Sequence, residues 1–264
     1  MSQTMGKTAL ITGASAGIGA SFARLLAKEG YNLVLVARDE NRLAEGGKLL
    51  ESEFGVKTEV LRADLSLPED LLRVEIRLQD AQRPVDVLIN NAGFGIKKSF
   101  LVNKVDDEQL LLDVLVAAPM RLMHAVLPSM KERNTGTIIN VSSVAGWVAS
   151  GTYSAAKSYI TVLSESLHSE LFSTEVKVTA LCPGFTRTEF HKRGKMRMAG
   201  LPPFMWLKAE NVAAKGWADA LAGKAISVPG WQYATLTMLI RYLPRPFIRK
   251  LGINFRMKRR SKRK

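Results

Sequence analysis

Short apolar runs alternate with longer amphipathic stretches along most of the chain. The short runs are rich in Val, Leu and Ile without polar alternation, which is typical of strands buried on both faces of a parallel sheet. They occupy residues 7–12, 32–37, 57–61, 85–90, 136–141, 176–181 and 225–230. Apolar residues at helical spacing fill most of the segments between them, at 20–28, 40–54, 68–81, 105–130, 158–171 and 209–222. We expect the helix at 105–130 to break or end at Pro128.

This alternation predicts an α/β fold: a single domain of three layers, with a doubly wound parallel sheet between two layers of helices. A chain of 264 residues is long enough to bury one such core. We expect the domain to span residues 1–230 and an apolar, basic extension to follow at 231–264. Right-handed crossovers bring the carboxyl ends of the strands to one edge, where ligands of open α/β sheets bind.

A glycine-rich turn follows the first strand and leads directly into a helix. Glycines allow a tight turn and a close approach of the backbone to a pyrophosphate, and the first N–H groups of the helix face that anion. The spacing is Gly-x3-Gly-x-Gly rather than the more usual Gly-x-Gly-x-x-Gly. We predict a dinucleotide cofactor bound by Gly13, Ser15, Ala16, Gly17, Ile18 and Gly19.

The second strand ends at Ala37 and Arg38, where dinucleotide-binding proteins recognise the adenine ribose. An acidic residue at this place would accept the 2′-hydroxyl of NAD(H), whereas an arginine favours the 2′-phosphate of NADP(H). We therefore expect NADP(H) to be the preferred cofactor, with NAD(H) as the second candidate.

Small and polar residues follow three other strands at the same predicted edge. Small side chains leave room for a ribose or a flat ring, and asparagine amides can tie neighbouring strands together. We expect the following residues to contact the cofactor: Asp64, Leu65, Asn91, Ala92, Gly93, Pro183, Gly184, Thr186 and Thr188.

Tyr153 and Lys157 are four residues apart at the start of a predicted helix, so they lie on one face of it. A phenol titrates near ~10, and a neighbouring ammonium favours the phenolate and lowers the phenol pKa. Tyr153 is therefore predicted to be a general acid/base. Ser143, from the preceding loop, could hold a carbonyl or alcohol oxygen, and Ser142 is the alternative to it.

These motifs together resemble the short-chain dehydrogenase/reductase family over residues 6 to about 190. The matches are Thr-Gly-x-x-x-Gly-x-Gly at 12–19, Asn-Asn-Ala-Gly at 90–93, Tyr-x-x-x-Lys at 153–157 and Pro-Gly at 183–184. The resemblance implies a Rossmann-like oxidoreductase that acts on CH–OH groups with NAD(P). It assigns proton transfer to Tyr153, the nicotinamide ribose to Lys157 and the substrate oxygen to Ser143. It also assigns the carboxamide to 183–186 and the pyrophosphate to the vicinity of Thr188.

Three features depart from the family pattern. Leu115 stands where the family often has an asparagine that supports a proton-relay water, so the relay would need another group or solvent. Only ten positions separate Ser143 from Tyr153, a shorter separation than we expect for the family. Ala16 replaces a basic residue common in NADP(H) users, which leaves the phosphate preference to Arg38. Leu115 keeps open a second class of function, a nucleotide-binding regulatory or scaffold protein with weak or no turnover.

The composition bears on disulfides, metal sites, membrane spans and charge. With Cys182 as the single cysteine, no internal disulfide can form, and His124, His168 and His191 lack metal-ligand spacing, so we expect no metal site. No signal-peptide pattern and no run of eighteen apolar residues occurs, so we expect no spanning helix and a cytoplasmic protein. The net charge of +14 is concentrated at the end of the chain, where seven of the last nine residues are Lys or Arg.

The chemistry of the later segments suggests partners. Methionines and aromatic rings within 188–222 fit a lid over a lipophilic carbonyl or alcohol substrate, or a segment packed on its own core. The apolar and basic segment after 231 fits the anionic inner face of a membrane, or a subunit interface. Nucleic acid ranks last, because no recognition module accompanies the charge. The apolarity of the helix at 105–130 predicts a homo-oligomer, either a dimer or a tetramer.

Overall fold

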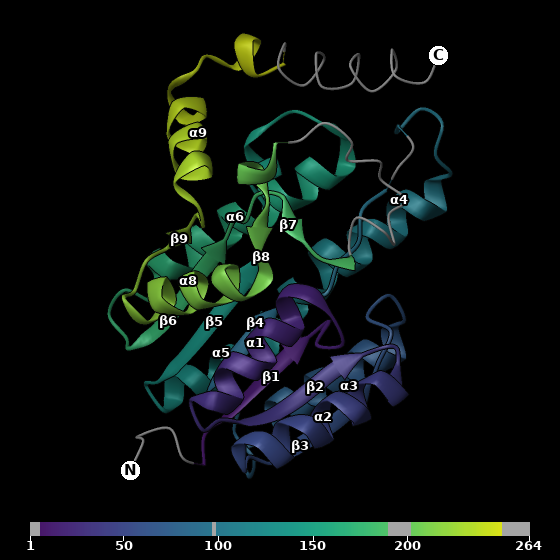
Figure 1. Ribbon diagram of the computed structural model, residues 1–264, viewed down its shortest axis with the longest axis vertical. Helices are drawn as coiled ribbons and strands as arrows, with labels where there is room; N and C mark the ends of the chain where they lie inside the picture. Colours follow the sequence, from purple (N-terminus) through teal and green to yellow (C-terminus); the bar gives the residue numbers. More distant parts are fainter. Residues whose placement is uncertain (1–5, 97–98, 190–201, 250–264) are drawn as a thin grey trace.

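The computed structural model describes residues 6–96, 99–189 and 202–249, and in them a seven-stranded sheet forms the centre of the molecule (Figure 1). All neighbouring strands are parallel, in the order β3-β2-β1-β4-β5-β6-β9. The strands are β1 (Thr8–Thr12), β2 (Asn32–Ala37), β3 (Thr58–Arg62), β4 (Val87–Asn90), β5 (Gly136–Val141), β6 (Val176–Leu181) and β9 (Ile226–Ser227). The predicted parallel sheet is confirmed, and each predicted apolar run overlaps one of its strands.

Helices cover both faces of this sheet and complete the three predicted layers (Figure 1). One face carries α1 (Gly17–Lys28), α2 (Glu40–Phe54) and α8 (Ala209–Leu221). The other carries α3 (Pro68–Gln79), α5 (Ala118–Glu132) and α6 (Gly151–Glu170). Alternate residues of a strand serve the two cores, as Ile11 and Leu10 of β1 do, which explains why the strands are apolar throughout.

The long predicted helix is continuous from Val105 to Glu132, and the expected break at Pro128 is wrong. Pro128 removes only the hydrogen bond to the carbonyl of His124, and both residues are exposed, so water can solvate that carbonyl. The irregularity lies earlier, in a π-helical turn at Asp113–Ala117 between α4 (Val105–Leu112) and α5.

By length and composition this 28-residue helix could cross a membrane, with 39% of its most apolar stretch buried in the fold. Leu122 and Val126 are fully buried and pack in the core beneath the sheet. Residues held against the sheet cannot also face lipid. The helix therefore belongs to the second helical layer.

Several short elements gather at the carboxyl edge of the sheet. They are the 3-10 helix η2 (Val144–Trp147), a parallel pair of β7 (Thr186–Arg187) and β8 (Leu207–Lys208), η3 (Pro203–Met205) and α9 (Trp231–Tyr242). Of the predicted lid at 188–222, α8 packs against α1 in the sheet core, so the lid that remains a prediction is 188–208. Residues 190–201 of it, including His191, lie outside the described residues.

Candidate active site

The glycine turn after β1 has the shape that the sequence predicts. Gly13 and Gly17 adopt φ values of 66° and 58°, which suit glycine, and Ala16 precedes α1 without a side-chain cap. A Cβ at Gly13 would lie 2.8 Å from Asn91 Nδ2, and one at Gly19 would collide with the Gly13 carbonyl oxygen. The first turn of α1 contains no acidic residue. The turn is therefore a narrow cradle beside uncapped helix N–H groups, which fits a pyrophosphate.

Asn91 fixes this cradle to the neighbouring strand. Its side-chain amide donates to the carbonyls of Thr12 at 2.9 Å and Gly13 at 3.2 Å. The Thr12 hydroxyl accepts from the backbone N–H groups of Asn91 and Ala92 and donates to Ile89. Thr12 was not among the predicted site residues, although it belongs to the glycine motif. Its hydroxyl holds the ends of β1 and β4 at one level, with Ala92 and Gly93 beside them.

The residues after β2 and β3 also meet at this edge. The Arg38 guanidinium lies 3.9 Å from an oxygen of Asp64, and 71% of its side chain is exposed. Asp64 accepts from the backbone and hydroxyl of Ser66, and its own N–H donates to Asp70. Leu65 is buried next to them. Arg38 is thus an accessible cation at the predicted ribose position, with only a loose contact to a carboxylate.

The loop after β6 brings Thr188 to the glycine turn. A Cβ at Gly17 would lie 3.0 Å from Thr188 Cβ, so the two positions are in contact. Arg42 of α2 holds this segment with a bidentate ion pair to Glu189, at 2.6 and 2.9 Å. Thr186 is buried and donates its hydroxyl to the carbonyl of Gly184. No local sequence signal linked Arg42 to Glu189, because 147 positions separate them.

Ser143, Tyr153 and Lys157 come together from η2 and α6. Ser143 and Tyr153 share a side-chain hydrogen bond, and the Ser143 hydroxyl accepts from the N–H of Ala145. The Lys157 ammonium lies 5.8 Å from the centre of the Tyr153 ring and donates to the carbonyl of Val141 at 2.7 Å. The two hydroxyls therefore face one point, with a buried cation beneath them.

Desolvation governs the pKa values of this group. Burial raises the pKa of Tyr153 to about 12, and the hydrogen bond from Ser143 opposes this only in part. Burial lowers the pKa of Lys157 to about 8. The expected lowering of the phenol pKa is therefore wrong, because the loss of water around the phenol outweighs the hydrogen bond from Ser143. At neutral pH the phenol is a proton donor.

Ser142 does not replace Ser143. It is buried, and its hydroxyl donates to the Lys157 carbonyl at 2.7 Å and meets the Thr161 hydroxyl. Cys182 is also buried, and burial raises the pKa of its thiol to about 11, so it is a small core residue. Across the residues that the structure describes, no three His, Cys, Asp or Glu side chains gather as a metal-binding group.

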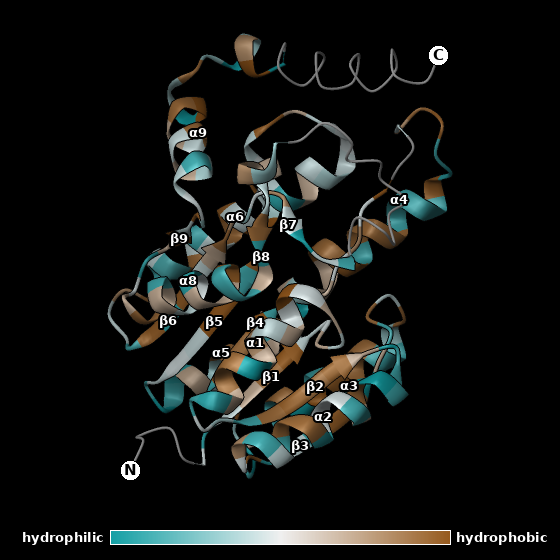
Figure 2. Cartoon of the chain, viewed as in Figure 1, coloured by the Kyte–Doolittle hydropathy of each residue, from teal (hydrophilic) through white to brown (hydrophobic). Residues whose placement is uncertain are grey.

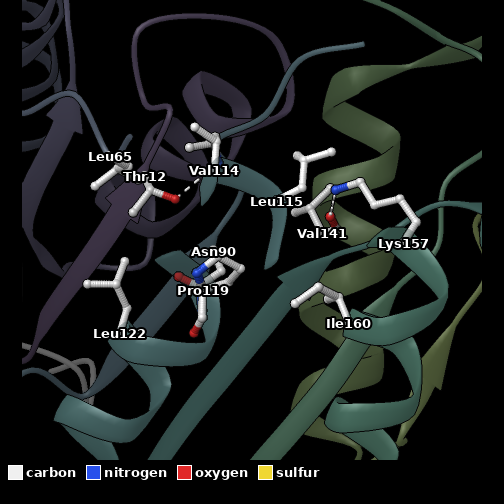
Figure 3. Close-up of a pocket in the computed structure, with 11 residues that line it drawn as sticks. Thr12, Leu65, Asn90, Val114, Leu115, Pro119, Leu122, Val141, Lys157 and Ile160 are labelled. Carbon is white, nitrogen blue, oxygen red and sulfur yellow. Dashed lines mark hydrogen bonds between the residues drawn. The ribbon is translucent and has the colours of Figure 1, made fainter. Parts of the chain in front are cut away.

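Leu115 lies beside Lys157 in a cavity of about 10 Å³ (Figure 3). The π-helical turn places it there, and a Cβ at Gly93 would lie 2.8 Å from Leu115 Cδ2. Asn90 lines the same cavity, and its side-chain oxygen is buried without a partner among the described residues. A space of this size holds one water molecule. Leu115 thus stands where a hydrogen-bonding side chain would reach the lysine.

Tyr233 is a residue that the sequence did not reveal. It is fully buried on α9, and its hydroxyl donates to the Met205 carbonyl at 2.6 Å and accepts from the N–H of Phe185. Its ring covers Gly184, so that any Cβ there would collide with it. Tyr233 therefore fixes the loop at Pro183–Thr186 from a position some fifty residues away.

A glycine cradle, an accessible arginine and a serine–tyrosine–lysine group at one sheet edge define a Rossmann-like oxidoreductase. Residues 7–197 match the family described as short chain dehydrogenase. The chain belongs to the short-chain dehydrogenase family, whose members are oxidoreductases acting on CH–OH groups.

Three similar proteins illustrate the relationship. The NADP-dependent 3-hydroxy acid dehydrogenase of Schizosaccharomyces pombe is 35% identical over 195 residues, which cover 72% of this chain and 75% of the relative. A short-chain dehydrogenase from Sphingobium yanoikuyae in complex with NADPH is 33% identical, with a TM-score of 0.82 over 90% of this chain and 96% of that one. The bulky-bulky ketone specific alcohol dehydrogenase from Comamonas testosteroni is 30% identical, with a TM-score of 0.78 over 90% and 95%.

Proposed function

We propose that the protein is an NADP(H)-dependent oxidoreductase that interconverts a carbonyl and a secondary alcohol on a lipophilic substrate. The observation that carries the proposal is the meeting of the Ser143 and Tyr153 hydroxyls above Lys157, at the edge that holds the glycine cradle. In this proposal NADPH, when bound, supplies the hydride. Ser143 holds the substrate oxygen, Tyr153 donates the proton to it, and the Lys157 ammonium stabilises the charge that remains on the phenol.

The cofactor preference is part of this proposal. The glycine cradle fits the pyrophosphate, with Thr188 beside Gly17, and Arg38 fits a 2′-phosphate because its guanidinium is exposed. The Sphingobium relative is described with NADPH and the yeast relative as NADP-dependent, which supports the same choice. Ser15, Ile18, Asp64, Asn91, Pro183 and Thr186 remain predicted contacts of the cofactor in this proposal.

An apolar substrate fits the surroundings of the phenol. Phe94, Ile96 and Tyr153 all pack against one small apolar cluster, made of Leu111, Leu115 and Ala156. The rings of Phe185 and Trp206 lie 6.1 Å apart on the loops at the carboxyl edge. The Comamonas relative is named for bulky ketones, which favours the same class of substrate. The scaffold alternative is not favoured, since all three catalytic side chains are present and the relatives are named as dehydrogenases.

The test is NADPH binding, followed by fluorescence, together with NADPH oxidation by a panel of ketones. We expect the wild type to oxidise NADPH, and Tyr153→Phe to lower kcat/KM by about 10²-fold or more while NADPH still binds, because only the proton donor is removed. Arg38→Ser should lower the ratio of kcat/KM for NADPH over NADH by about tenfold, the value of one charge-assisted contact. Tight NADPH binding without oxidation by any ketone would favour the scaffold.

Two associations complete the proposal. We propose a homo-oligomer, either a dimer or a tetramer, supported by exposed apolar side chains at Met120, Tyr159 and Val162 on α5 and α6. We also propose that the segment 231–264 attaches the protein to the anionic inner face of a membrane. Its support is a sequence that combines apolar residues with Lys and Arg.

A further inference from the structure

The inner face of α9 is fixed to the loops of the candidate active site. Tyr233, Thr237 and Ile240 are buried at helical spacing. Tyr233 bonds to Phe185 and Met205, as described above, and the guanidinium of Arg241 lies 5.2 Å from the centre of the Trp147 ring in η2. The helix is therefore held in one orientation, and its opposite face points away from the domain.

That outer face is apolar and uncovered. Trp231, Met238, Leu239 and Tyr242 are 76%, 62%, 61% and 81% exposed, and at 100° per residue they lie opposite Tyr233, Thr237 and Ile240. No other part of the chain that the structure describes packs on them. Figure 2 shows α9 standing beyond β9 and α6, with hydrophobic residues along it. An exposed stripe of this kind marks an interaction surface.

The charge around this stripe has one sign. Between 231 and 264 the sequence contains no Asp or Glu. It contains these basic residues: Arg241, Arg245, Arg249, Lys250, Arg256, Lys258, Arg259, Arg260, Lys262, Arg263 and Lys264. Arg245 and Arg249, which directly follow α9, are exposed. The family match ends at 197, before this segment begins.

We propose that the outer face of α9, defined by Trp231, Met238, Leu239 and Tyr242, docks on an anionic lipid bilayer. The helix lies in the plane of the interface, with its apolar side chains among the acyl chains and its Trp and Tyr at the level of the headgroups. Arg245 and Arg249, which are exposed after the end of α9, reach the lipid phosphates, for which guanidinium is well suited. This goes beyond charge attraction by the tail, since it assigns the contact to named side chains on a fixed helix.

A second copy of the chain fits this surface less well. A two-fold contact would place α9 against its own copy, since such an interface uses the same patch on both subunits. The arginines of both copies would then face each other without a carboxylate between 231 and 264 to pair with them. A bilayer with anionic lipid supplies the missing negative charge.

The fixed orientation of α9 would also bring the bilayer close to the entrance of the candidate active site. This step rests on the proposed function. Because α9 packs on η2 and on the loop of Phe185, the bilayer would lie next to the rim through which an apolar substrate reaches Ser143 and Tyr153. A substrate dissolved in the membrane would then enter the site without crossing water.

The experiment is co-sedimentation of the full chain with vesicles of phosphatidylcholine, with and without phosphatidylserine. The test variant is Met238→Glu/Tyr242→Glu, at two outward positions of α9. The matched control is Leu49→Glu/Ile76→Glu, which makes the same change of charge at positions 69% and 58% exposed on α2 and α3. We expect the wild type and the control to bind vesicles that contain phosphatidylserine, and the test variant to bind at least about tenfold more weakly.

Each other outcome overturns the assignment. If both variants bind as the wild type does, the basic tail alone attaches the protein, and the proposed membrane association survives without the α9 surface. If both variants lose binding equally, the net charge of the protein controls vesicle binding, and the α9 surface does not. If the wild type does not bind, and light scattering shows that only the test variant loses its oligomeric state, α9 is a subunit interface. If the wild type neither binds nor depends on α9 for assembly, the membrane proposal as a whole fails. None of these readouts depends on oxidoreductase activity.

Discussion

At the scale of single residues, the balance between desolvation and charge decides what Tyr153 does. A neighbouring ammonium stabilises a phenolate, but Lys157 is buried and already donates to the carbonyl of Val141, and Tyr153 is half-buried. The phenol pKa of about 12 keeps the proton on Tyr153 throughout the neutral range. A protonated phenol is the form that reduction of a carbonyl requires. In the free protein the phenol therefore carries the proton that reduction of a carbonyl would consume.

The pKa of Lys157 predicts a pH dependence for the proposed ketone reduction. This pKa of about 8 means that the ammonium loses its proton just above neutrality, while Tyr153 keeps its own. We expect kcat/KM for ketone reduction to be constant below about pH 8 and then to fall about tenfold per pH unit. The measurement is a pH profile at low concentrations of both substrates. A profile that stays flat to about pH 10, near the ordinary pKa of lysine, would contradict this role of Lys157.

Thermal unfolding in the same buffers separates this effect from a loss of the fold. The pKa of Lys157 in the folded protein lies below its ordinary value of 10.5, so the unfolded chain binds more protons between about 8 and 10.5. Stability from this group therefore rises with pH in that window, since the cost of burying a cation disappears. The predicted activity falls where this contribution to stability increases.

The sequence was informative about residues whose chemistry is local. Strand, glycine turn and helix identified the cradle, and the four-residue spacing placed Tyr153 and Lys157 on one face of α6. It could not show the burial that raises the phenol pKa. It also could not show Tyr233 or the Arg42–Glu189 pair, because their partners are distant in the chain and only the folded structure joins them.

At the scale of elements, continuous apolar runs predicted the strands well because both faces of the sheet are covered. The hydrophobic pattern was a poorer guide to where a helix ends or changes its geometry. Proline at an exposed helical position removes one hydrogen bond that water replaces, so Pro128 did not end α5. The π-helical turn that presents Leu115 has no compositional signal. The two-residue β9 is short because only Ala180 and Leu181 pair with it.

The packing of α9 on the loop after β6 predicts a sharp effect at Gly184. A Cβ there collides with the fully buried ring of Tyr233, so Gly184→Ala must displace α9 or the loop. We expect the free energy of unfolding to fall by about 3 kcal/mol, at the upper end for overpacking. The measurement is chemical denaturation of the full chain.

Gly46→Ala is the matched control, because a Cβ at this position in α2 meets nothing within 4 Å. Alanine is the better helix former, so this variant should gain about 0.5–1 kcal/mol. Equal stability of the two variants would mean that the Tyr233 ring does not cover Gly184.

At the scale of the whole molecule, the strand order gathers at one edge side chains from six strand ends, and the outer helical layer turns apolar residues to solvent. Met120 of α5 and Tyr159 of α6 are 39% and 43% exposed, and the Tyr159 hydroxyl donates to the Met120 sulfur at 3.4 Å. Val162, one turn after Tyr159, is 61% exposed. These side chains form one patch over two adjacent helices, which suits a two-fold contact with a second copy.

We therefore expect light scattering to give a mass of at least twice the 29.1 kDa of one chain. Met120→Glu/Val162→Glu would place four carboxylates in a two-fold interface, and like charges there are costly, so this variant should be monomeric. Leu49→Glu/Ile76→Glu, with the same charge change on α2 and α3, should keep the mass of the wild type. A wild-type monomer, or an oligomer unchanged by the carboxylates on α5 and α6, would mean that the patch serves another partner.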